Sequence, residues 1–133
     1  MPRYAETVNL PISYEEAVSR TRGALKDEGF GVITEIDVKA TMKEKLNEDV
    51  APYVILGACN PSLAHRALST EKEIGLLLPC NVCVWDNGDG SSTVAAINVK
   101  EVFQVMDNPA LVQVAETVTN KLASVLQQLQ GVK

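Results

Sequence analysis

The sequence predicts a small α+β domain, built from an antiparallel sheet and a long C-terminal helix. Residues 3–10 and 30–38 alternate apolar with polar side chains, as half-buried strands do. A turn signal, Asn-Gly-Asp-Gly at 87–90, separates two apolar runs, which is typical of a β-hairpin. Near the C-terminus an apolar stripe follows helical spacing as far as Gly131. At 133 residues, we expect a single domain over 1–133.

In the N-terminal third of the chain, the sequence predicts a strand, a helix, a second strand and a short helix, in that order. Ser13 and Glu16 form a capping box, in which each side chain satisfies a free amide at the helix start. Gly29 ends this first helix. After the second strand, Asp37 is expected to cap a short helix over 38–48.

The middle of the chain predicts a strand, a helix and an interrupted apolar run. Residues 53–59 are almost continuously apolar, which predicts a strand buried on both faces. Asn60 then caps a helix that begins at the following proline and continues to about Thr70. Pro79 interrupts the run 75–86, and because proline cannot donate to a sheet ladder we expect a kink, bulge or edge there.

The last third predicts the return strand of the hairpin and the longest helix. Residues 93–98 pair antiparallel with the preceding run, and residues 99–106 form an irregular helical segment. Asn108-Pro109 is a second cap-and-proline helix start. The apolar stripe of that helix consists of Leu111, Ala115, Val118, Leu122, Val125, Leu126 and Leu129.

Composition excludes several classes of function. The chain has 12 basic and 17 acidic residues and a net charge of −5, which argues against nucleic-acid binding and against attraction to anionic membranes. No apolar run is long enough to span a membrane, and the N-terminus shows no secretory signal. We therefore expect a cytoplasmic protein whose three cysteines are thiols or ligands rather than disulfides.

The candidate site is a repeated Cys-Asn pair, each copy beside a proline. Cys59-Asn60 closes one predicted strand, and Cys80-Asn81 lies near the start of another. A thiol before a helix start is favoured as thiolate, so this pattern indicates a reactive thiol or a ligand pocket. The alternative is that both cysteines only pack, since cysteine is among the most buried residues, and that Asn beside Pro is ordinary turn and cap chemistry.

The same positions allow two metal or redox interpretations. Cys80 and Cys83 have Cys-x-x-Cys spacing, but residues three apart on a strand point to opposite faces. Cys59, His65 and Cys80 could supply three ligands to zinc if folding brought them together. The simpler interpretation of His65 is a single histidine on the surface of a helix.

Three motifs, at 28–38, 53–61 and 75–82, resemble those of a bacterial and archaeal family called domain of unknown function 302 (DUF302). The resemblance covers nearly the whole chain. It implies a TBP-like, helix-grip fold, in which a curved antiparallel sheet packs as one layer on a long C-terminal helix. It also implies homodimers, and it supplies no catalytic residues because the family has no established activity. Its pattern matches Cys59, Asn60, Pro61, Pro79, Cys80 and Asn81.

These observations lead to one functional hypothesis and two alternatives. The hypothesis is a homodimeric module that binds a small molecule or ion near Cys59 and Cys80, with Asn60 and Asn81 as polar contacts. One alternative is a thiol-dependent enzyme with Cys59 as nucleophile. The other is a structural or partner-binding dimer without a ligand. The sequence leaves open which ligand binds and whether any reaction is catalysed.

Overall fold

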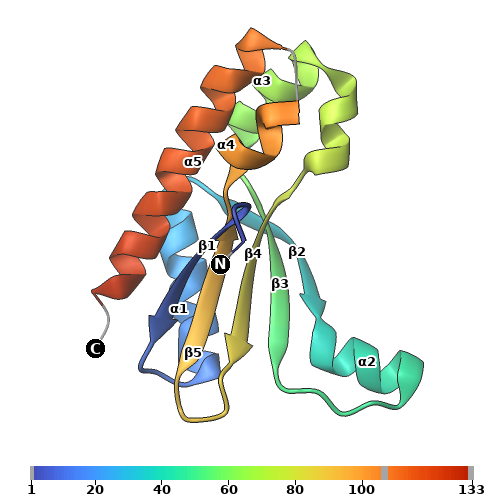
Figure 1. Ribbon diagram of the computed structural model, residues 1–133, viewed down its shortest axis with the longest axis vertical. Helices are drawn as coiled ribbons and strands as arrows, with labels where there is room; N and C mark the ends of the chain where they lie inside the picture. Colours follow the sequence, from blue (N-terminus) through green and yellow to red (C-terminus); the bar gives the residue numbers. More distant parts are fainter. Residues whose placement is uncertain (1, 106–107, 132–133) are drawn as a thin grey trace.

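The computed structural model describes residues 2–105 and 108–131, which form an antiparallel sheet with helices on one face (Figure 1). The five strands lie in the order β1-β5-β4-β3-β2, and every neighbouring pair is antiparallel. The predicted α+β class, with a long C-terminal helix on an antiparallel sheet, is confirmed. The strands are β1 (Ala5–Leu10), β2 (Gly31–Asp37), β3 (Tyr53–Cys59), β4 (Cys80–Asp86) and β5 (Ser92–Ile97).

The predicted helices also form, and their capping residues act as expected. The side chains of Ser13, Asp37, Asn60 and Asn108 each accept a hydrogen bond from a backbone N–H in the first turn of their helix. The segment predicted at 99–106 is α4 followed by the short 3₁₀ helix η2, and Met106 lies outside the described residues. The helices are α1 (Tyr14–Asp27), α2 (Val38–Leu46), α3 (Pro61–Thr70), η1 (Lys72–Leu77), α4 (Val99–Val102), η2 (Phe103–Val105) and α5 (Pro109–Gln130).

The core lies between α1, α5 and one face of the sheet, which we call the inner face. The register pairs Leu56 with Val82 and Val84 with Val94, and these side chains are fully buried. All seven residues of the predicted α5 stripe are buried, and α5 contacts both α1 and β1. Burial of apolar surface on this one face therefore holds the long helix to the sheet.

The prediction that residues 53–59 are buried on both faces is wrong. The inner-face residues of β3 are buried, whereas Tyr53 and Ile55 on the opposite, outer face are only half-buried. The reason is visible in Figure 1, where α1 lies behind the sheet and the face toward the viewer carries only α2, at its lower edge. On this outer face Tyr53 stacks on Trp85, with ring centroids 5.4 Å apart.

Two further expectations need correction, and a third is confirmed. The alternation at 30–38 does not produce a half-buried strand, because β2 is an edge strand whose residues are exposed apart from half-buried Val32. The capping box at the start of α1 forms only in half, since the Glu16 carboxylate instead accepts a 2.7 Å hydrogen bond from Arg20. The interruption expected at Pro79 is present, since residues 75–77 of the run 75–86 belong to η1 and the strand begins at Cys80.

A second group of elements lies beyond one end of the sheet. In Figure 1, α3, η1 and α4 stand above the strands together with the start of α5. Because the strands are antiparallel, the ends of β3 and β5 and the starts of β2 and β4 meet at this same edge. The candidate site lies where these strand ends meet the upper helices.

Candidate functional site

The two Cys-Asn motifs, far apart in sequence, are neighbours at this edge. The register of β3 and β4 pairs Ala58 with Cys80 and Gly57 with Asn81. Cys59 is the last residue of β3, so it lies beside the start of β4, where Cys80 is the first residue. Folding therefore brings the two motifs into one place.

Gly57 allows β2, β3 and Pro79 to approach one another closely. A methyl group at Gly57 would lie 2.0 Å from Oγ1 of Thr34 and 2.7 Å from Cγ of Pro79. The peptide bond between Leu78 and Pro79, immediately before β4, is cis. Glycine is thus needed at position 57, because the side chains of Thr34 and Pro79 occupy the space that a Cβ atom would take.

Asn60 caps helix α3 at the same edge. Its side-chain oxygen accepts a 3.2 Å hydrogen bond from the backbone N–H of Leu63, and Pro61 occupies the first turn of α3. The cap and the proline together fix the direction in which α3 leaves the strand. The apolar face of α3 is consequently directed over the strand ends.

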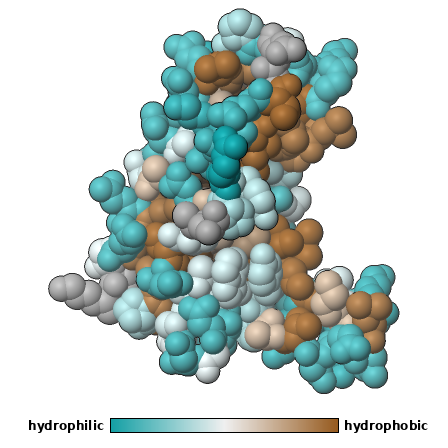
Figure 2. Space-filling model, in the orientation of Figure 1, coloured by the Kyte–Doolittle hydropathy of each residue, from teal (hydrophilic) through white to brown (hydrophobic). Residues whose placement is uncertain are grey.

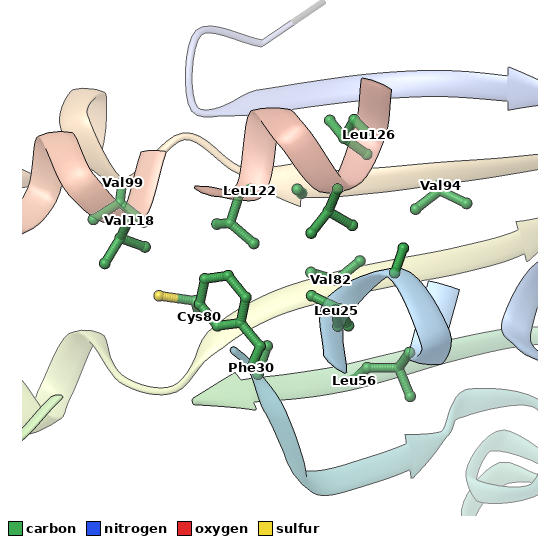
Figure 3. Close-up of a cluster of buried hydrophobic side chains, with 14 of the residues drawn as sticks. Leu25, Phe30, Leu56, Cys80, Val82, Val94, Val99, Val118, Leu122 and Leu126 are labelled. Carbon is green, nitrogen blue, oxygen red and sulfur yellow. The ribbon is translucent and has the colours of Figure 1, made fainter. Parts of the chain in front are cut away.

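A cavity of about 280 Å³ lies between α3 and the strand ends. Cys59, Asn60 and Cys80 belong to its lining, and Figure 3 shows the Cys80 sulfur pointing toward Val99 and Val118. The side chains around it come from the start of β2 and the residue before it, the end of β3, α3, the two residues before β4, the start of β4, α4, η2 and the first half of α5. Apolar members of the lining include Phe30, Ala58, Leu63, Val99, Phe103 and Val118.

Asn81 and Cys83 do not share this cavity. Alternation along β4 places Asn81 opposite Gly57 and Cys83 opposite Ile55, on the outer face, whereas Cys80 lies on the inner face. Asn81 is exposed. The prediction that Cys80 and Cys83 point to opposite faces is confirmed, and a joint redox or metal role of this pair has no geometric basis.

The two thiols at the cavity differ in their surroundings. Cys80 is 7% exposed, and burial, with a smaller contribution from the neighbouring Cys59, raises the pKa of its thiol to about 11. Cys80 is therefore a neutral thiol at pH 7 and forms part of the apolar wall of the cavity. Cys59 is half-buried and is the more accessible of the two.

The zinc site considered for Cys59, His65 and Cys80 is not formed. His65 is exposed on α3 and is not part of the cavity lining. Over residues 2–105 and 108–131, no cluster of three or more His, Cys, Asp or Glu side chains is placed to hold a metal ion. The helical spacing from the Asn60 cap turns His65 away from the apolar face of α3.

Sequence reasoning missed most of the cavity wall. Phe30 was assigned to a strand, Phe103 to an irregular helical segment and Val118 to the stripe of the last helix. In the structure all three line the same cavity. Their apolar character alone could not reveal this, because a side chain that lines a cavity and one that fills a core look the same in a sequence.

The geometry defines a class of protein: an open antiparallel sheet packed on α1 and α5, with an apolar cavity at the strand ends. The family model described as "Domain of unknown function DUF302" matches residues 6–129, and the chain belongs to this family. A crystal structure titled as an uncharacterized conserved protein DUF302 from Bacillus stearothermophilus is similar. It has a TM-score of 0.87 and 30% sequence identity, over 96% of this chain and 99% of that chain.

None of the curated proteins compared matches this chain. Within the described part of the chain, no helix combines the length and the apolar character needed to cross a membrane.

Proposed function

We propose that the protein is a homodimeric small-molecule-binding module of the cytoplasm, with its ligand in the cavity bounded by Cys59, Asn60 and Cys80. The observation that carries this proposal is the convergence of two distant motifs on one cavity of about 280 Å³. Ligand sites are usually concave and mostly apolar, with few polar groups. Asn81 has no part in the proposed site, because it lies on the outer face.

A small molecule suits the cavity better than an ion. Among the described residues that line it, none is Asp, Glu, Lys, Arg or His. A charge buried without a partner is strongly unfavourable, so an ion would lack compensation here. The same lining offers no general base beside Cys59, which disfavours the alternative of a thiol-dependent enzyme.

Binding of three neutral probes tests the site. 1-Hexanol, cyclohexanol and benzyl alcohol are titrated into protein with labelled methyl groups, and we expect shifts in the NMR signals of Val99, Val114 and Val118. Ala67 is 2% exposed and lines the cavity, so Ala67→Leu should remove the shifts by filling it. The matched Ala123→Leu, at an exposed position on α5, should keep them. The proposal fails if no probe shifts these signals, or if a folded Ala67→Leu binds as the parent does.

The dimeric state is supported by the outer face of the sheet. This face carries half-buried Tyr53, Ile55 and Trp85, and α2, at its edge, has no buried residue at all. Burial, and a smaller contribution from a hydrogen bond with Cys83, raise the pKa of Tyr53 on this face to about 12. A stable interface on this face would bury roughly 1,200–2,000 Å² in total.

Light scattering tests this part of the proposal. We expect a dimer at micromolar concentration that dissociates in Ile55→Lys, on the outer face. The matched Leu68→Lys, exposed on α3, should remain dimeric. A monomeric parent, or an Ile55→Lys protein that stays dimeric, would contradict an interface on this face.

A further inference from the structure

Two residues that line the cavity are also well exposed, and they mark its mouth. Ile33 on β2 is 62% exposed and Leu68 on α3 is 41% exposed. Figure 2 shows hydrophobic surface gathered at the upper right, in the region of α3 and η1. Exposed Leu76 on η1 extends this surface, although it does not line the cavity. A molecule that enters the cavity must therefore pass between apolar side chains.

An irregularity of β2 places Ile33 at this mouth. The pairing of β2 with β3 shifts between Val32 and Thr34, so Ile33 has no partner in the register. Such bulges redirect a side chain relative to the regular alternation. Here the redirected side chain is a large aliphatic one that contacts the cavity and also remains open to solvent.

The interior of the cavity offers almost nothing to a polar ligand. Its polar side chains in the described chain are Cys59, Asn60 and Cys80. The Asn60 oxygen already accepts the hydrogen bond from Leu63, and the Cys80 thiol is neutral and buried. Apart from the amide N–H groups of Asn60 and the half-buried Cys59 thiol, a buried polar group of a ligand would find no side-chain partner in the described lining, which is unfavourable. Most of the wall formed by the described residues is aliphatic, and its aromatic rings are those of Phe30 and Phe103.

We infer that the ligand presents an uncharged aliphatic chain, which enters between Ile33 and Leu68 with its apolar end first and ends beside Cys80. This inference rests on the proposed function and adds the chemical class of the ligand and its direction of entry. Any polar head group of the ligand stays at the mouth, in contact with water. The bulge in β2 and the exposed Leu68 then serve as the two sides of the entrance.

Calorimetry with a series of alcohols tests the chemical class. From 1-butanol to 1-octanol, each added methylene should strengthen binding about fourfold while the chain still fits, because each buried methylene adds a constant increment. 1,8-Octanediol, which must bury a hydroxyl, should bind at least tenfold more weakly than 1-octanol. The inference is overturned, and the proposed site retained, if benzyl alcohol shifts the cavity signals while the alcohols show no dependence on length. Both fall if no probe reaches the cavity.

Two charge-introducing variants test the entrance. Ile33→Glu places a charge at the mouth and should weaken 1-octanol binding about tenfold or more. Val112→Glu makes the same kind of change on α5, at a position that is 49% exposed and does not line the cavity, and should leave the affinity within twofold. Since both positions are exposed, both variants should fold. Equal affinities in the two variants would overturn the proposed entrance.

Discussion

Gly57 is the position where a single added methyl group most sharply tests the packing of the cavity edge. In Gly57→Ala the new carbon would lie 2.0 Å from Oγ1 of Thr34 and 2.7 Å from Cγ of Pro79, so at least two groups must move. Overpacking of this kind costs about 1–3 kcal/mol, and the stiffer unfolded chain returns about 0.4–1 kcal/mol. With two neighbours displaced, we expect a net loss of about 2 kcal/mol in the free energy of unfolding.

Urea unfolding followed by circular dichroism measures this loss. At an m-value of about 2 kcal/mol/M, the midpoint should fall by about 1 M. Gly23→Ala is the matched control, because no atom lies within 4 Å of its added carbon, and it should stabilise the protein by about 0.5–1 kcal/mol. In the Gly57→Ala background, Thr34→Ala should recover part of the loss by removing the nearest atom. If Gly57→Ala is as stable as the parent, the close approach described here is wrong.

Three other predictions concern the cap and the buried thiol. Asn60→Ala should cost about 1 kcal/mol in unfolding free energy, because it removes the cap of α3, whereas Asn60→Asp should cost less; equal losses in urea would contradict the capping role. Iodoacetamide at pH 8 should label Cys80 far more slowly than Cys59, as followed by peptide mass spectrometry, and equal rates would show that Cys80 is not buried. Because the pKa of Cys80 is higher in the folded protein than in the unfolded chain, its contribution to stability is complete below about pH 9 and is lost as pH rises through about 11. The parent should therefore lose stability relative to Cys80→Val over that range, and a constant difference would refute the assignment.

Local signals predicted the elements well. Helix caps could be predicted at Ser13, Asp37, Asn60 and Asn108, because capping depends on a few neighbouring residues. The apolar stripe of α5 could be predicted, because a helix with one buried face repeats its apolar residues at a fixed period. Each of these signals is contained within a short segment of the chain.

The features that depend on contacts between distant segments were harder to predict. The apolar run of β3 suggested burial on both faces, yet only the layers of the fold decide whether a helix covers the second face. The bulge at Ile33 arises from the pairing of β2 with β3, and the sequence of β2 alone does not predict it. The close approach at Gly57 likewise depends on Thr34 and Pro79, each more than twenty residues away.

The candidate site was predictable in part, for the same reason. The repeated Cys-Asn pair indicated Cys59, Asn60 and Cys80, all of which line the cavity. It also indicated Asn81, which alternation along β4 turns to the outer face. The aliphatic wall, which determines the ligand class we infer, could be identified only once α3, α4 and α5 were placed above the strand ends.

A crystal structure of the protein with 1-octanol is the most direct test of the binding site. We predict continuous electron density for the alkyl chain from the gap between Ile33 and Leu68 to the wall at Cys80, with the hydroxyl at the mouth. An octanol molecule bound only elsewhere, or a cavity that holds a network of ordered water in its place, would contradict the proposed site.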